Sequence, residues 1–194
     1  MGRSLYRCIV ITGILFIILG CVYPLFVTLT GRIFFPEESN GGIIYKDNKS
    51  IGAKLIGQNF FSPKYFHGRP SAAGEKGYDG LSSSPSNLAT TNIKLYENIK
   101  SETKKILKEN PTIKISDIPN DLVNASGSGL DPHISLQAAL LQIPRVAHAR
   151  KMSEDKLKTL IYSLLEKPAL GIIGEENINV LLLNILVDEA KNEE

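Results

Sequence analysis

The chain contains a long uncharged run, from Cys8 to Gly31, between Arg7 and Arg32. As a helix that rises about 1.5 Å per residue, this run would be roughly 36 Å long, enough to cross a hydrocarbon core of about 30 Å. We therefore predict one transmembrane helix over residues 8–31. Pro24 is a point at which such a helix can kink, which membrane helices tolerate better than soluble ones.

Two other interpretations of this run are less favoured. A cleaved secretory signal has an apolar region of roughly 7–15 residues, and this run is longer. The string Ile18–Cys21 resembles a lipoprotein processing box, in which the cysteine becomes the lipidated N-terminus. However, the apolar run continues beyond it, through Val22 to Val27. The length of the run favours a retained membrane helix.

The distribution of charge predicts a topology. The formal net charge is +2, from 22 Lys and Arg against 20 Asp and Glu, and the surplus corresponds to Arg3 and Arg7. Because positive flanks stay in the cytoplasm, we predict a cytoplasmic tail over residues 1–7 and an extracytoplasmic soluble domain over residues 32–194. This domain is neutral and has no dense basic stripe, which argues against nucleic acid as a partner.

The cysteine content limits the chemistry of the domain. Cys8 and Cys21 are the two cysteines, and both lie in the predicted span. The soluble part therefore has no disulfide, thiol nucleophile or cysteine zinc ligand. A domain of about 160 residues can fold on its hydrophobic core alone.

The pattern along the domain predicts an α+β fold with a small sheet and several helices. Short apolar stretches at 41–45 and 51–56 predict a two-stranded hairpin. The segment from Phe60 to Asn87 is rich in Ser, Gly and Pro. It predicts a long loop that binds a partner or is held down by its aromatic residues. The alternating residues 112–118 predict one more strand.

Helical spacing of apolar residues predicts the helices of the domain. We expect one over residues 93–108, which Asn110-Pro111 ends, and others that begin with Ser135 and Ser153 as N-caps. Pro144 predicts a break in the helix that begins at Ser135, followed by a new short helix. Residues 177–187 are apolar nearly all round, which predicts a helix buried in the core or against a partner.

Motifs for catalysis are weak. No P-loop is present, and Gly127-Ser128-Gly129 is half of a dinucleotide fingerprint and reads better as a turn. The S-x-x-K motif occurs at Ser101 and at Ser153 with no Lys-Thr-Gly in the chain, which indicates chance.

The histidines give no stronger signal for an active site. Asp131, His133 and Ser135 alternate in one short segment, which favours a helix entry over a catalytic triad. A metal site made of His67, His133 and Asp131 is disfavoured because no ligand spacing supports it. We predict that the chain is not catalytic alone and acts as a subunit, receptor or scaffold.

Several strings occur in a fixed order along the chain. They are Leu55–Phe60, Tyr65–Ser71, Ser86–Ala89, Ala125–Asp131, Gln142–Arg150 and Asn179–Asn184. With the span that ends in Val22-Tyr23-Pro24-Leu25, they make nearly the whole chain resemble the C subunit of the bacterial Kdp high-affinity potassium-transporting ATPase. Ser84-Pro85-Ser86 departs from the family, in which Gly often precedes Ser-Asn-Leu.

The resemblance implies a non-catalytic subunit of a P-type ATPase complex in the bacterial plasma membrane. The phosphorylated ATPase subunit and the ion-conducting subunit would be separate partner chains. Consistent with this, the Asp-Lys-Thr-Gly phosphorylation motif is absent. The resemblance also implies a catalytic chaperone that raises the ATP affinity of the pump subunit in a ternary complex. A domain on the other side of the membrane from ATP would have to act through the membrane helices.

From the residues we hypothesise that the domain caps the extracellular face of the ion-conducting subunit, with segments 60–87 and 125–150 as docking or gating surfaces. The candidate partner residues are Gln58, Tyr65, Phe66, Arg69, Ser71, Asn87, Asp131, Gln142 and Arg145. No catalytic residue or metal ligand is assigned. The alternative for each residue is internal: glycines that serve turns, and Arg69 paired with Asp79 or Asp131. The alternative function is a membrane-anchored binding or sensor domain unrelated to a pump.

Overall fold

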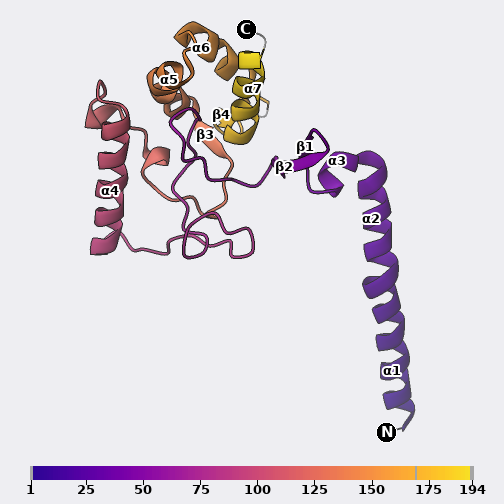
Figure 1. Cartoon of the computed structure of the whole chain (residues 1–194). Coiled ribbons are helices and arrows are strands. Elements are labelled where there is room, and N and C mark those ends of the chain that lie inside the picture. The colour runs from indigo at the N-terminus through magenta and orange to yellow at the C-terminus, as the bar shows by residue number, and fades with distance from the viewer. Residues whose placement is uncertain (1, 169, 193–194) are drawn as a thin grey trace. The chain divides into compact units, whose positions relative to one another are not determined.

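The computed structural model describes residues 2–168 and 170–192 and divides into two compact units, Met1–Ile51 and Gly52–Glu194. The first unit is dominated by one apolar helix, Gly2–Phe34 (Figure 1). It consists of α1 (Gly2–Ile17), a π-helical turn η1 (Ile18–Val22) and α2 (Tyr23–Phe34). None of its residues is buried and its mean hydropathy reaches 2.6. The helix is long and apolar enough to cross a membrane.

The π-helical turn accommodates the proline of this helix. Pro24 has no N–H to donate. In the wide turn before it, the backbone N–H of Tyr23 donates a hydrogen bond to the carbonyl of Ile18. After it, Thr28 Oγ1 donates to the carbonyl of Pro24 at 2.7 Å. The helix therefore continues through Pro24.

A short helix and a hairpin follow. Helix α3 spans Pro36–Ser39, and strands β1 (Ile43–Lys46) and β2 (Lys49–Ala53) pair as the predicted hairpin. Asp47 and Asn48 both have positive φ, 51° and 60°, as a two-residue type I′ turn requires. The second strand begins two residues earlier than we predicted.

The second unit combines helices with a two-stranded antiparallel sheet. Its helices are α4 (Ile93–Glu109), α5 (Leu136–Arg150), α6 (Glu154–Ser163) and α7 (Val180–Asn192), with 3₁₀ turns η2 (Ile115–Asp117) and η3 (Asn120–Leu122). Strands β3 (His133–Ser135) and β4 (Asn177–Asn179) pair with Ile134 opposite Ile178. The prediction of a mixed α and β fold with one N-terminal apolar helix is confirmed.

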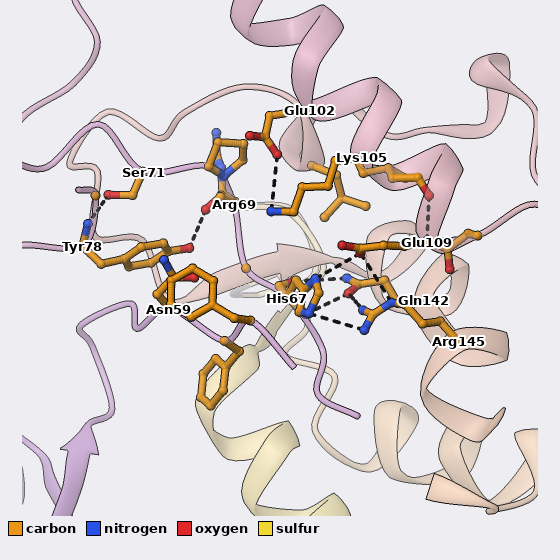
Figure 2. Close-up of a pocket in the computed structure, with 18 of the residues that line it drawn as sticks. Asn59, His67, Arg69, Ser71, Tyr78, Glu102, Lys105, Glu109, Gln142 and Arg145 are labelled. Carbon is orange, nitrogen blue, oxygen red and sulfur yellow. Dashed lines mark hydrogen bonds and ion pairs between the residues drawn. The ribbon is translucent and has the colours of Figure 1, made fainter. Parts of the chain in front are cut away.

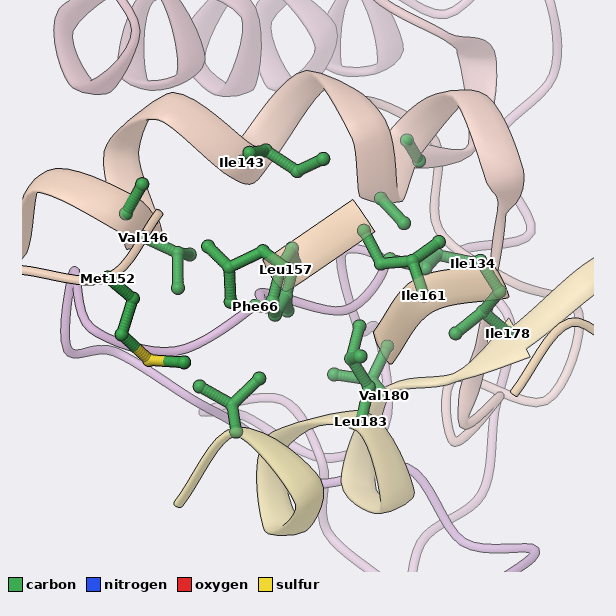
Figure 3. Close-up of a cluster of buried hydrophobic side chains, with 14 of the residues drawn as sticks. Phe66, Ile134, Ile143, Val146, Met152, Leu157, Ile161, Ile178, Val180 and Leu183 are labelled. Carbon is green, nitrogen blue, oxygen red and sulfur yellow. The ribbon is translucent and has the colours of Figure 1, made fainter. Parts of the chain in front are cut away.

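The hydrophobic core lies between α5, α6, α7 and the β3–β4 sheet (Figure 3). Its fully buried side chains include Ile143, Leu157, Ile161 and Leu183. Phe66, from the long loop, is inserted into the same cluster with no exposed surface. The core therefore fixes one point of a loop that has no helix or strand over residues 54–92.

Three predictions of secondary structure are wrong, one of them only at the start of the final helix. Residues 112–118 form no strand; Ile115–Asp117 is a 3₁₀ turn in which the backbone N–H of Lys114 donates to Asp117. Residues 177–179 belong to β4 and not to the final helix, because β3 pairs with them.

The third wrong prediction is the helix break at Pro144. Helix α5 runs unbroken through this residue. Pro144 is exposed, while Ile143 and Val146 beside it are buried, so core packing on the other side of the helix outweighs the cost of the proline.

Candidate functional site

A cavity of about 220 Å³ lies between the 59–78 loop, α4 and α5 (Figure 2). Four of the predicted candidate residues line it, namely Arg69, Ser71, Gln142 and Arg145. The strings Tyr65–Ser71 and Gln142–Arg150, far apart in the sequence, thus meet at one place. This cavity is the candidate site.

Two side-chain amides hold the loop beside the cavity. Gln142 on α5 accepts from the backbone N–H of His67 at 2.8 Å and donates to its carbonyl at 3.1 Å. Asn184 on α7 does the same for Phe66, at 2.8 and 2.9 Å. Each amide makes the pair of bonds that a neighbouring strand would make. Residues 66 and 67 are therefore fixed without being in a sheet.

Arg145 joins the same network from inside α5. One terminal nitrogen donates to the carbonyls of Pro63 and Tyr65 at 2.8 and 3.0 Å, and the other donates to Gln142 at 2.6 Å. Its side chain is only 5% exposed. Burial lowers the pKa of Arg145, an effect that the nearby Glu109 opposes. The terminal nitrogens of Arg145 thus bind other residues of this chain, which agrees with an internal structural role for this candidate residue.

His67 stands at the centre of the charged end of the cavity, and we did not include it among the candidate partner residues. Its Nδ1 lies 3.4 Å from Glu109 Oε2, and its Nε2 lies 3.2 Å from the carbonyl of Ser62 and 3.4 Å from Arg145. Burial and the charge of Arg145 lower the pKa of His67, and the Ser62 carbonyl and Glu109 partly oppose this. The sequence signal that could have identified His67 as a site residue is its position inside the Tyr65–Ser71 string.

Arg69 pairs with Asp131, one of the two internal partners that the sequence suggested. The ion pair measures 2.9 Å. Burial acts to raise the pKa of Asp131, but hydrogen bonds from His133 and from Arg69 hold the pKa below its ordinary value. This pair links the 60–87 loop to the segment that precedes β3.

Ser71 and Tyr78 close the loop on the other side of the cavity. Ser71 Oγ donates to the carbonyl of Gly129 at 2.5 Å and accepts from the backbone N–H of Tyr78 at 2.7 Å. The Tyr78 hydroxyl donates to the carbonyl of Arg69. Burial, helped by the charge of Asp131, raises the pKa of Tyr78 to about 12.

The remaining candidates lie outside this cavity. Tyr65 donates from its hydroxyl to Asp188 at 3.1 Å, and Arg150 lies over its ring at 4.8 Å. Gln58 lines a separate small cavity, and Asn87 is exposed with φ of 52°. The structure thus does not bring the nine candidates together as one site.

Two glycines of the resemblance strings are needed for close packing. A Cβ at Gly57 would lie 2.7 Å from the carbonyl oxygen of Asp131. Gly129 has φ of +69°, and a Cβ there would lie 2.6 Å from the carbonyl oxygen of Ser84. These glycines serve the internal fit of the loop.

The geometry does not assemble a triad from Asp131, His133 and Ser135. Asp131 accepts from the backbone of His133, whereas the Ser135 hydroxyl donates to Asp121 and caps α5. No group of three or more His, Cys, Asp and Glu residues that could hold a metal occurs among the described residues.

The similarity of this chain to known proteins extends over nearly its full length. A family model described as the c chain of K⁺-transporting ATPase matches residues 5–189. The potassium-transporting ATPase KdpC subunit of Caldanaerobacter subterraneus is 43% identical over 192 residues, which cover 98% of each chain. The subunit of the same name from Polynucleobacter asymbioticus is 44% identical, covering 96% of this chain and 98% of the relative. That from Clostridioides difficile is 36% identical, covering 95% and 96%.

Proposed function

Because this chain belongs to the family of potassium-transporting ATPase C subunits, we propose that it is a non-catalytic accessory subunit of an ATP-driven, high-affinity potassium uptake complex. The observation that carries the proposal is the length of the match. Residues 5–189 include both the apolar helix and the soluble domain, so the resemblance is not to one module alone.

The membrane anchor supports a place beside other membrane subunits. The helix Gly2–Phe34 has no buried residue and thus needs lipid or other helices around it. We place the tail 1–7 in the cytoplasm and the domain 32–194 outside, because Arg3 and Arg7 flank the helix on its N-terminal side. The phosphorylated ATPase subunit and the ion-conducting subunit are the proposed partners.

The 60–87 loop is the proposed docking surface. Its backbone is fixed over residues 63–67 by Gln142, Asn184 and Arg145, and further along by Ser71 at Tyr78 and Asp79 at Leu81, so less ordering is needed when it binds. At the same time it presents two large apolar side chains, Phe61 and Leu81, with 79% and 100% of their surface exposed. Apolar side chains on a rigid loop are suitable anchors for a protein interface. In this proposal the buried candidates shape the loop, and the exposed side chains of Phe61, Leu81 and the candidate Asn87 touch the partner.

We assign the effect on ATP to coupling and not to a nucleotide site in this chain. The candidate cavity of about 220 Å³ is smaller than the roughly 300–1,000 Å³ typical of pockets for small organic ligands, so we do not place a nucleotide in it. A chaperone effect on ATP affinity would then arise because assembly favours one state of the pump subunit. Removal of this chain should raise the Michaelis constant for ATP of the remaining complex.

Co-purification from detergent-solubilised membranes that contain all subunits tests the proposal. The tagged chain should retain the ATPase and ion-conducting subunits, and Leu81→Glu should lose them. Ile172→Glu is the matched control, since Ile172 is 83% exposed on another loop of the domain. The proposal fails if the tagged chain runs alone and potassium-dependent ATP hydrolysis is intact after its deletion. A reporter fused after residue 194 tests the topology separately.

A further inference from the structure

The carbonyl of Leu19, in the apolar helix, has neither of the donors that a helix can supply. In the α-helical pattern its donor is the backbone N–H four residues later, that of Tyr23, but this N–H donates to Ile18. In the π-helical pattern its donor is five residues later, at Pro24, which has no N–H. The backbone therefore leaves Leu19 with an unpaired acceptor.

No side chain of the described residues supplies the missing bond. Thr28 and Thr30 each donate to the carbonyl four residues earlier, at 2.7 and 2.8 Å, and neither of those carbonyls is that of Leu19. Residues 13–22 contain no hydroxyl, amide or charged side chain, and the thiol of Cys21 is a weak donor. The helix does not satisfy this carbonyl by itself.

The unpaired carbonyl lies in the middle of the apolar run. Leu19 is 11 residues after Cys8 and 12 residues before Gly31, the two ends of the uncharged run. At 1.5 Å per residue, about 16–18 Å of helix separates it from either end. In a bilayer with a hydrocarbon core of about 30 Å, this is the depth with the least water. A backbone group without a partner is costly there, so its donor must come from another chain.

The neighbouring residue leaves room for a second helix beside this carbonyl. The peptide group concerned joins Leu19 to Gly20, which has no side chain. The helix itself does not require glycine here, because a Cβ at Gly20 would meet only two ring atoms of Phe16, at 3.8 and 3.9 Å, which is ordinary contact. Small residues are enriched where membrane helices approach one another closely.

We propose that the turn from Leu19 to Pro24 is a docking site for another membrane helix, one side chain of which donates a hydrogen bond to the Leu19 carbonyl. The donor is a hydroxyl, amide or indole N–H, because such a group satisfies one carbonyl at this depth without burying a charge. The inference rests on the proposed function, in which another subunit of the potassium-transporting complex supplies the helix. The bond fixes the depth and rotation of the anchor against that subunit.

Solid-state NMR of the full chain can observe this carbonyl separately. The dipeptide Leu-Gly occurs twice in the sequence, at Leu19-Gly20 and at Leu170-Gly171. A chain labelled with carbonyl-¹³C leucine and ¹⁵N glycine therefore gives two carbonyl–nitrogen cross-peaks. Leu170→Ile removes the second cross-peak and so assigns both, and it changes a side chain that is 89% exposed on a loop.

A hydrogen bond moves a carbonyl ¹³C resonance downfield. For the chain alone in phosphatidylcholine vesicles, we expect the Leu19 resonance at the upfield position of an unbonded carbonyl. It should move downfield when the chain is reconstituted with the ATPase and ion-conducting subunits. A downfield position already in the chain alone, from water or from a second copy, would overturn the proposal.

Pro24→Ala supplies the missing N–H, so the helix can close on itself as an α-helix. Its Leu19 resonance should be downfield in the chain alone and should not move on assembly. Its affinity for the other subunits in detergent should fall about 3- to 30-fold, the range that hydrogen bonds between membrane helices contribute. Leu25→Ala, the neighbouring change that keeps the proline, should show the wild-type movement of the Leu19 resonance. The site is refuted if Pro24→Ala binds as tightly as wild type or if the two variants respond alike.

This inference and the proposed function fail in different ways. A wild-type chain that does not assemble with the other subunits would refute both. A chain that assembles while its Leu19 carbonyl stays unbonded would refute the docking site alone.

Discussion

Asn184 offers the sharpest test of how the loop is held. Replacing it with Leu keeps the approximate volume but leaves the buried N–H and carbonyl of Phe66 without partners. Each orphaned buried group costs about 1–3 kcal/mol, so the free energy of unfolding should fall by about 2–6 kcal/mol. A domain is stable by only about 5–15 kcal/mol. The variant should therefore be severely destabilised although no charge is changed.

Urea unfolding in detergent, followed by far-UV circular dichroism, measures this change. With a slope of about 2 kcal/mol per molar urea, the midpoint should shift by about 1–3 M. Asn98→Leu is the control, because Asn98 is exposed on α4, and it should change the stability by less than about 0.5 kcal/mol. A loss below about 1 kcal/mol for Asn184→Leu, with an unchanged slope, would show that these hydrogen bonds do not hold the loop.

Three further predictions concern other parts of the domain. Gly129→Ala should lower the free energy of unfolding by more than about 1 kcal/mol, because of its φ of +69° and the carbonyl of Ser84; Gly127→Ala, with nothing near its Cβ, should not. Pro144→Ala should stabilise α5 by about 1–3 kcal/mol, measured by the same unfolding, since the residue is exposed and the helix continues through it. In an absorbance titration, one tyrosine should ionise near pH 12, and Tyr78→Phe should remove this ionisation. The stability that the raised pKa of Tyr78 contributes is present below pH 10 and is lost as the pH rises toward 12.

Local signals predicted the helix starts because a cap needs only its neighbours. Ser135 and Ser153, the two predicted N-caps, each accept from a backbone N–H three residues later, and α5 and α6 begin after them. Asn92 caps α4 in the same way, although only the apolar spacing predicted that helix. Strands β3 and β4 have three residues each and exist through their pairing. No local pattern of that length could predict them.

The candidate site was predictable in part. The resemblance strings contain Arg69, Asp131 and Arg145, and the structure shows what each of them contacts. His67 and Glu109 were missed as a pair because Glu109 is a charged residue on an amphipathic helix, where a solvated position is the ordinary expectation. Their contact depends on where α4 lies over the loop, which the spacing along the chain does not encode.

The amides that fix residues 66 and 67 also set an order of events during synthesis. The hydrogen-bond partners of Phe66 and His67, Asn184 and Gln142, lie 118 and 75 positions further along the chain and are synthesised later. At about 5–20 residues per second, Asn184 leaves the ribosome roughly 6–24 s after Phe66. The loop therefore stays without its fixed shape until the last helix is made, and its ordering is among the slow, non-local steps of folding. A partner that recognises the fixed loop would thereby bind only chains in which α7 has already been made.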